Sequence, residues 1–349
     1  MSVTQMAIET GIYAGLRDTI DIHIHGNPDF CRRLLDDVDI VRLAKATGMR
    51  AVMLKSHAGP TADRAYIAEK AVGGGIGVFG LICLNPSVGG LNPAAVALAI
   101  KGGVKAVWMP SMWAENHAAY VRRAGKGMGY ESIGMDFPDE GISILDGKRL
   151  KPAVAEILDM VARADLMLAT GHVSLAEAHV LLEEAKARGI TKLVVHTVNY
   201  HVMKFPVADL KDMVDRCGAV LEFGFSSLPN GVWDPADPAR GSTVADCAAI
   251  MRAVGPQNCL VTSDCGQFST PMPIEAMRLW VEHLKFSKFA QTEIDAMTKH
   301  VPARLLGLPS TNPAAPLGGS HPATSLAPKG AQEAPNWHSS PDPDTLAYQ

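Results

Sequence analysis

Short apolar and β-branched stretches alternate with segments of helical period along most of the chain. Each stretch has the length of a buried strand and is followed by a helix-like pattern. The eight stretches are 19–25, 51–55, 77–84, 104–109, 166–171, 192–196, 219–225 and 259–263. Strands that alternate with helices indicate parallel pairing through right-handed crossovers. The pattern therefore predicts an α/β protein, with a TIM barrel of eight strand–helix units over residues 1–308.

Capping signals place the ends of several predicted helices. Asn92 and Pro93 are typical of an N-cap and a first-turn proline. Ser174 and Glu177 have the spacing of a capping box, and Ser242 is expected to begin another helix. The glycines at which helices are expected to stop are Gly48, Gly189 and Gly255. An open doubly wound sheet is the competing architecture, but it needs a glycine-rich loop after the first strand, where the chain reads Ile-His-Gly-Asn-Pro.

Two segments depart from the regular alternation. An insertion at about 110–152 follows the fourth strand and contains a predicted hairpin around Asp146 and Gly147. It falls on the face where barrel active sites are built, so we expect a lid or pocket wall, with a subunit-contact flap as the equal alternative. Residues 309–349 hold 8 of the 23 prolines and show no apolar period. This composition predicts a disordered or extended tail.

Composition excludes several classes of function. The formal net charge is −4, with 32 basic and 36 acidic residues and no basic block, which argues against nucleic-acid binding. The longest apolar stretches, 78–84 and 94–100, are far shorter than the roughly 20 residues of a membrane span. The chain begins without an apolar export signal, so a cytoplasmic location is expected. The six cysteines form no Cys-x-x-Cys pair, which disfavours thiolate zinc and a disulfide framework.

Histidines and one aspartate fall at the ends of the predicted strands. His23 and His25 are two residues apart in the first strand, so both imidazoles should face the same side of the barrel. His172, His196 and Asp264 end strands five, six and eight, where catalytic groups of such barrels converge. Each residue alone is typical of a satisfied core or loop position, but the joint pattern favours a metal site. Imidazoles with one carboxylate suit zinc, with manganese or iron as alternatives, better than calcium or magnesium.

This constellation, on a predicted eightfold barrel, resembles the amidohydrolase superfamily of metal-dependent hydrolases. The ending at 301–308 resembles the final helix of that superfamily. The stretch from 141 to 196 resembles a less characterised branch of it without an assigned substrate. The resemblance covers about residues 18–308 and implies a metal-dependent enzyme.

The resemblance also implies roles for individual residues. His23 and His25 would be ligands of the metal, and Asp264 both a ligand and the catalytic base. His172 and His196 would hold a metal or polarise the substrate carbonyl. Many relatives bridge two metals with a Lys or Glu at the end of strand four, but no such group stands at 106–110. One divalent metal per subunit is therefore favoured over two.

Further polar and aromatic residues are candidates for the site. Lys55 and Glu222 could serve a second metal, or Glu222 could face outward as an ordinary polar residue. The candidate substrate-binding residues are Lys55, His57, Trp108, Trp113, His201 and Arg240. For the loop residues among them, ordinary hydrogen bonding is an equal alternative, and the tryptophans also suit the core or the pocket wall.

The predicted function is hydrolysis of a small molecule. A metal-activated water would attack the carbonyl of an amide, cyclic amide or lactone, and Asp264 would carry the proton to the leaving group. The alternative is a metal-dependent decarboxylase or hydratase of a small organic acid, whose anion Lys55 and Arg240 would suit. A non-catalytic, metal-stabilised barrel that binds a small molecule is a third hypothesis. A homo-oligomer is expected, and the substrate itself is not encoded in any pattern we recognise.

Overall fold

A computed structural model describes residues 11–124, 140–228 and 242–309. Eight parallel strands form one sheet in the order β1-β2-β3-β4-β7-β8-β9-β10. These strands are β1 (Ile20–His25), β2 (Ala51–Lys55), β3 (Gly77–Cys83), β4 (Ala106–Trp108), β7 (Met167–Ala169), β8 (Leu193–Val195), β9 (Val220–Gly224) and β10 (Cys259–Thr262). The predicted strands and their parallel pairing are thus confirmed.

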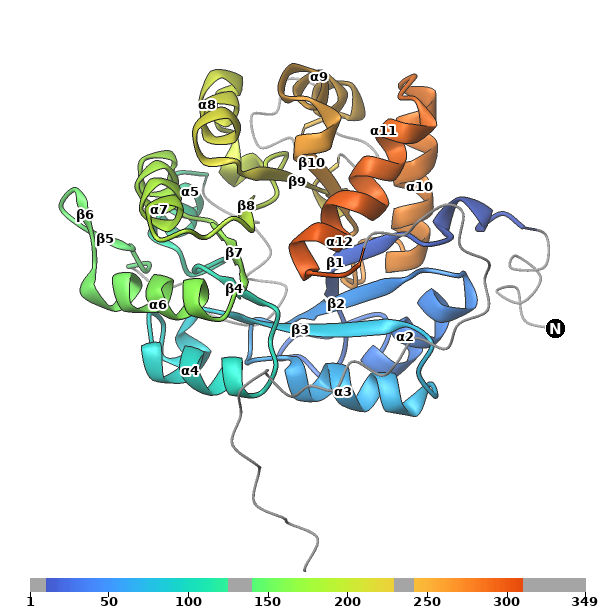
Figure 1. The fold of residues 1–349 in the computed structure, drawn as a ribbon, viewed down its shortest axis with the longest axis horizontal. Coiled ribbons are helices and arrows are strands. Elements are labelled where there is room, and N and C mark those ends of the chain that lie inside the picture. Colours follow the sequence, from blue (N-terminus) through green and yellow to red (C-terminus); the bar gives the residue numbers. More distant parts are fainter. Residues whose placement is uncertain (1–10, 125–139, 229–241, 310–349) are drawn as a thin grey trace, which may run out of the picture. The chain divides into compact units, whose positions relative to one another are not determined.

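Helices follow the strands and lie around them (Figure 1). They are α2 (Asp37–Ala46), α3 (Ala62–Ala71), α4 (Pro93–Lys101), α5 (Glu115–Ala124), α6 (Pro152–Arg163), α7 (Leu175–Ala187), α8 (Val207–Cys217), α9 (Val244–Val254), α10 (Pro273–Phe286), α11 (Gln291–Asp295) and α12 (Val301–Leu306). Short helical turns are η1 (Ala14–Leu16), η2 (Pro86–Val88), η4 (His201–Met203), η5 (Phe225–Ser227), η6 (Pro256–Asn258) and the π-helical η7 (Ala296–His300). Among the described residues, no helix has both the length and the apolar character to cross a membrane.

Backbone hydrogen bonds bring the last strand next to the first. The amide of Asp264 donates to the carbonyl of His23 at 2.8 Å, and the amide of His25 donates to the carbonyl of Cys265 at 2.9 Å. Ile24 and Cys265 form a parallel bridge at the same place. The sheet is therefore a nearly closed barrel, and the predicted TIM-barrel architecture is confirmed.

Two apolar layers surround the strands. The outer layer packs between strands and helices, and the inner one fills the barrel with residues such as Ile20, Met53 and Leu260. Val301 and Leu305 of α12 join this inner layer beside residues at the starts of strands. Because apolar side chains occupy the beginning of the barrel, the polar residues are concentrated where the strands end.

A β-bulge in β1 decides which of its residues face inward. Asp21 pairs with Val52 and Ile24 with Leu54, so β1 has one residue more than β2 between these two pairs. Ile22 belongs to the inner apolar layer, and His23 and His25 both lie at the polar end of the barrel. The expectation that the two histidines share a face is met, although simple alternation does not hold along the whole strand.

The capping predictions are confirmed with one shift. Asn92 caps α4 before Pro93, and Ser174 with Glu177 forms a capping box on α7. The N-cap of α9 is Thr243 rather than Ser242, because the Thr243 hydroxyl is the side chain that accepts from the amide of Asp246.

The insertion after β4 contains the predicted hairpin. Strands β5 (Leu145–Asp146) and β6 (Arg149–Leu150) pair antiparallel around Gly147. The insertion also supplies helix α5. Residues 125–139 of the insertion and 310–349 of the predicted tail lie outside the described residues.

Candidate metal centre

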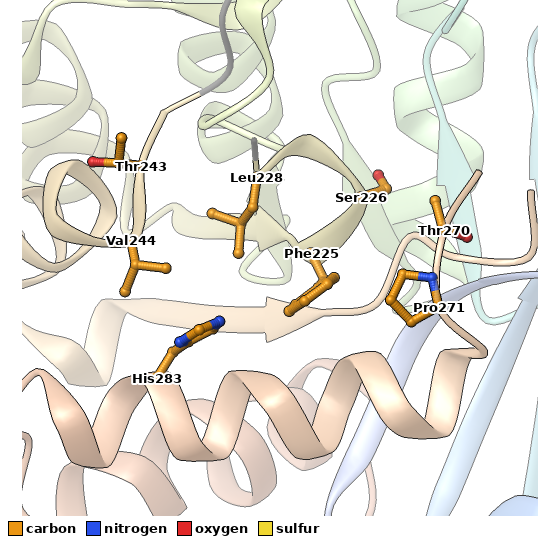
Figure 2. Close-up of a pocket in the computed structure, with 8 residues that line it drawn as sticks. All are labelled: Phe225, Ser226, Leu228, Thr243, Val244, Thr270, Pro271 and His283. Atoms are coloured by element: carbon orange, nitrogen blue, oxygen red, sulfur yellow. The ribbon is translucent and has the colours of Figure 1, made fainter. Parts of the chain in front are cut away.

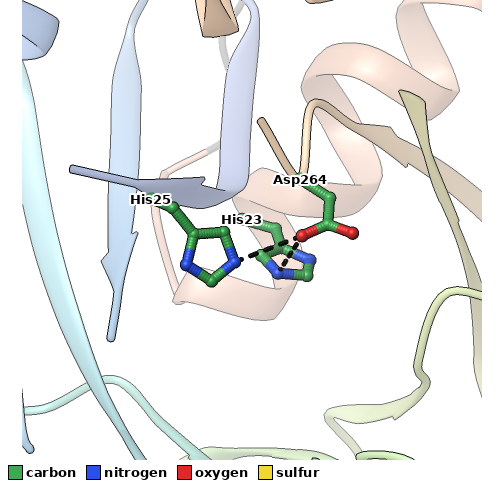
Figure 3. A group of neighbouring side chains, drawn as sticks. All are labelled: His23, His25 and Asp264. Atoms are coloured by element: carbon green, nitrogen blue, oxygen red, sulfur yellow. Dashed lines mark hydrogen bonds and ion pairs between the residues drawn. The ribbon is translucent and has the colours of Figure 1, made fainter. Parts of the chain in front are cut away.

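Three side chains converge where β1 and β10 end. Oδ1 of Asp264 lies 2.8 Å from Nε2 of His23 and 3.2 Å from Nε2 of His25, and the three ligand atoms lie within 4.8 Å of one another. Figure 3 shows both imidazoles turned toward the carboxylate. We call His23, His25 and Asp264 the triad. Two imidazole nitrogens and one carboxylate oxygen are a donor set of the zinc class with room for a further ligand, so these residues fit a metal.

Glu222 fixes the orientation of His23 and His196 through the Nδ1 atoms of their rings. Its Oε1 lies 2.7 Å from Nδ1 of His23 and its Oε2 lies 2.7 Å from Nδ1 of His196. The Thr262 hydroxyl also donates to Oε1 at 2.8 Å. A carboxylate that accepts from Nδ1–H leaves Nε2 of each ring as the lone-pair nitrogen. Nδ1 of His25, in contrast, has no hydrogen-bond partner among the described residues.

Glu222 is predicted, if it faces inward, to pair with a cation, either a metal or Lys55. Glu222, His23 and His196 are close enough to share an ion. Both oxygens of Glu222 are, however, already taken up by imidazole N–H groups at hydrogen-bond distance. We therefore interpret Glu222 as a residue that positions candidate metal ligands. It points inward and is fully buried, and its partners are histidines rather than Lys55.

In this cluster, burial and neighbouring histidines change the pKa values of the carboxyl groups in opposite directions. Burial alone would raise the pKa of Asp264, but His23 and His25 hold that pKa well below its usual value. Burial would likewise raise the pKa of Glu222, and His196 and His23 lower it instead. Both carboxyl groups are therefore ionised at neutral pH, which is the form that binds a cation.

Two further predicted histidines stand beside the triad. Nε2 of His172 lies 3.1 Å from Nε2 of His196. Burial lowers the pKa of His196 to about 4, so its ring is neutral at pH 7. Since Nδ1–H of His196 donates to Glu222, its Nε2 accepts, and the proton between the two rings belongs to Nε2 of His172.

His117 is a site residue that the sequence did not reveal. It lies on α5, and its Nδ1 is 2.5 Å from Nδ1 of His172. Its position in the insertion, eight residues beyond Met109, gave no strand-end signal. Only the folding of α5 onto the barrel brings it to His172.

Lys55 and Trp108 contact the histidines of the site. Nζ of Lys55 is 3.1 Å from Nε2 of His23 and 4.1 Å from the ring centre of Trp108. Burial lowers the pKa of Lys55. The Trp108 ring is fully buried, with its centre 4.7 Å from that of His23 and 4.5 Å from that of His196. Trp108 therefore supports the imidazoles from the core and does not line the cavity described next.

A cavity of about 610 Å³ opens above the triad. Its lining residues are His25, Phe30, Cys31, Arg32, Arg33, Lys55, His57, Met112, His172, His196, Thr197, Tyr200, Ser226, Asp264, Gln267, Phe268, Ser269 and Thr270. Of the predicted substrate-binding residues, Lys55 and His57 line it. Trp113 contacts the His57 ring from outside the lining, His201 packs against Tyr200, and Arg240 lies outside the described residues.

The sequence missed the loop after β1 as part of this cavity. Phe30, Arg32 and Arg33 come from it, and Ser226 from η5 donates to Oδ2 of Asp264 at 2.6 Å. A phenylalanine, two arginines and a serine in loops have no spacing that distinguishes them from surface residues. No sequence signal was available to find them.

A second cavity of about 420 Å³ shares Ser226 and Thr270 with the first (Figure 2). It is lined by Phe225, Ser226, Leu228, Thr243, Val244, Thr270, Pro271 and His283. Of these lining residues only His283 carries a nitrogen that can ligate a metal. The candidate chemistry therefore belongs to the cavity above the triad.

Replacement of Gly171, the residue before His172, is expected to lower the free energy of unfolding by more than its backbone angle alone predicts. Gly171 has φ +60, and a Cβ there would lie 2.4 Å from the carbonyl oxygens of Met109 and Pro110. Gly171→Ala should lower the free energy of unfolding by about 1–2 kcal/mol for the left-handed backbone and by a further 1–3 kcal/mol or so for the clash. Urea denaturation measures this loss.

Gly189→Ala is the matched control. Gly189 has φ +79, but a Cβ there would meet nothing within 4 Å. It should therefore show only the backbone part of the loss. Equal losses in the two variants would contradict the close approach of Gly171 to the backbone of Met109 and Pro110.

The fold and the site together define a barrel of eight strands and helices with a candidate metal centre at its polar end. The chain belongs to the family DUF6282, described as a family of unknown function, whose model matches residues 18–222. No curated protein matches the sequence of this chain.

Solved structures with hydrolase names share the fold. A proposed 2-pyrone-4,6-dicarboxylic acid hydrolase from Pseudomonas putida is 16% identical over 83% of this chain and 97% of its own, with a TM-score of 0.50. An amidohydrolase from Pseudomonas aeruginosa is 13% identical over 85% and 97%, with a TM-score of 0.51. A protein of that species described as a probable dipeptidase is 11% identical over 87% and 98%, with a TM-score of 0.52. At these identities the likeness supports the fold.

Proposed function

We propose that this chain is a metal-dependent hydrolase of the amidohydrolase superfamily that cleaves an amide, cyclic amide or lactone of a small molecule. The observation that carries the proposal is the convergence of the triad at the base of the cavity, with Glu222 behind His23. A divalent ion of the zinc class, when bound, supplies Lewis-acid polarisation and a nucleophilic water at neutral pH. The names of the structural neighbours agree with a hydrolase.

The remaining steps, proton transfer and positioning, are assigned to residues of the chain. Asp264 is ionised and lines the cavity, so it is placed to accept the proton of the attacking water and return it to the leaving group. Ser226 holds the second oxygen of Asp264 and thereby its orientation. His172 lines the same cavity and donates its Nε2–H to Nε2 of His196, so it holds the His196 ring in place beside the triad.

Metal content is the first test. Protein purified without a histidine tag should carry about one equivalent of metal per chain by plasma mass spectrometry, since the triad is the proposed ligand set. The double variant His23→Ala, His25→Ala should carry none. A double variant His179→Ala, His283→Ala, which removes two histidines away from the triad, should keep the metal. Protein that binds no metal even after addition would contradict the proposal.

Turnover is measured on a panel of amides, cyclic amides and lactones. Release of acid or amine supports hydrolysis, whereas evolved carbon dioxide would favour the decarboxylase alternative. The two reactions are distinguished because only decarboxylation releases a carbon atom of the substrate as carbon dioxide.

A further inference from the structure

The tautomer of His57 follows from its neighbours. The amide of Ser111 donates to Oδ1 of Asn85 at 3.0 Å, which identifies that arm of the Asn85 side chain as the oxygen. The other arm, Nδ2, lies 3.2 Å from Nδ1 of His57. An amide nitrogen can only donate, so Nδ1 of His57 accepts. The proton of the neutral imidazole is therefore on Nε2.

This Nε2–H faces the cavity next to the triad. His57 is 7% exposed and lines the cavity, and its Nε2 has no hydrogen-bond partner among the described residues. Its ring stacks on that of His25, with the centres 5.2 Å apart and the planes 26° apart. A fixed hydrogen-bond donor therefore stands beside one member of the triad.

Arg32 contributes a charge to the same cavity. It is exposed, no described carboxylate pairs with it, and its guanidinium lies 4.8 Å from the ring centre of Phe268. The neighbouring Arg33 differs, because it is tied to Asp29 at 2.7 Å. Arg32 is thus the guanidinium in the lining that is available to a ligand.

Cationic side chains outnumber carboxylates around the cavity. Asp264 is the only carboxylate among the lining residues, and its Oδ2 already accepts from Ser226. A ligand that complements this lining offers oxygen acceptors and negative charge. The Phe30 and Phe268 rings also line the cavity, with the Phe30 ring centre 6.2 Å from that of His57. They add apolar surface for a planar carbon skeleton.

We infer that the substrate is an organic acid with a planar apolar body, whose carboxylate is bound by Arg32 while His57 Nε2–H donates to a substrate oxygen near the triad. The inference rests on the proposed function in taking this cavity as the substrate site. It adds the substrate class and two binding residues.

Benzoate is the probe, with benzyl alcohol as its neutral counterpart, and binding to metal-loaded protein is measured by calorimetry. Arg32→Gln should weaken benzoate about tenfold, the loss of one charge-assisted hydrogen bond, and leave benzyl alcohol unchanged. Arg32→Lys should recover part of the loss, since it keeps the charge without the planar fork. Arg42→Gln, an exposed arginine paired with Asp39 on α2, makes the same charge change away from the cavity and should have no effect.

The His57 tautomer is read directly by ¹⁵N NMR of labelled histidine, with His57→Phe identifying its signals. Protonation on Nε2 is expected, and protonation on Nδ1 would overturn the donor assignment. Benzoate binding that is lost in His23→Ala, His25→Ala but insensitive to Arg32→Gln would mean that the carboxylate binds at the metal alone, which overturns the anion site. If the parent protein holds no metal and Arg32→Gln still weakens benzoate binding, the anion site is supported and the proposed hydrolase function is refuted.

Discussion

Asp264→Asn is expected to lower turnover about 10²- to 10⁴-fold while the fold is kept. Asp264 is the one carboxylate of the triad, and its ionised form is the candidate proton acceptor. Asparagine has the same shape but cannot take up the proton. The residue has φ +47, a left-handed conformation that asparagine tolerates better than most residues. Loss of activity would therefore report on chemistry rather than on backbone strain.

The measurement is kcat on the best substrate of the panel, with metal content and circular dichroism of each variant. Ser226→Ala is the comparison, because it removes only the hydrogen bond to Oδ2 of Asp264 and should cost a much smaller factor. Near-normal turnover of Asp264→Asn would remove Asp264 from the role of base. Equal losses in the two variants would instead indicate that orientation of the carboxylate is what matters.

Glu222→Gln should weaken metal binding about 10- to 100-fold, although Glu222 is not itself proposed as a ligand. Its carboxylate accepts from Nδ1 of both His23 and His196 at 2.7 Å. An amide in its place offers one acceptor oxygen and one donor nitrogen, so one of the two imidazoles loses its partner or changes tautomer. An imidazole with its proton on Nε2 cannot give that nitrogen to a metal.

Competition with a chelator of known affinity measures the change. Glu177→Gln is the matched control, because Glu177 is another buried carboxylate whose partners, Ser143 and Ser174, lie in the insertion and at the start of α7. It is expected to lower the stability of the protein and leave the metal affinity unchanged. If Glu222→Gln bound metal as tightly as the parent, the assignment of Glu222 as the positioning residue would be wrong.

Much of the fold could be predicted from the sequence because the apolar pattern of each strand and helix extends over only a few residues. Strands buried on both faces produce apolar runs, and helix ends are marked by residues such as Asn92 and Ser174. The shift from Ser242 to Thr243 shows the limit of that signal. Both side chains can cap a helix, and the backbone geometry decides between them.

The candidate site could be predicted only in part, because only some of its residues fall in a local pattern. Histidines at strand ends are visible because a barrel brings all its strand ends to one face. His117 and Arg32 were not visible, because they lie on a helix and a loop whose path depends on packing. The bulge in β1 was also hidden, since a single extra residue leaves the order of apolar and polar positions almost unchanged.

By itself the sequence determined the barrel and the order in which His23, His25, His172, His196 and Asp264 reach its polar end. These follow from patterns that recur within a few residues. The tertiary structure alone decided that Glu222 faces two histidines and that Asn85 sets the tautomer of His57. Such relations join residues far apart in the chain, and they depend on hydrogen-bond distances that no local pattern of residues records.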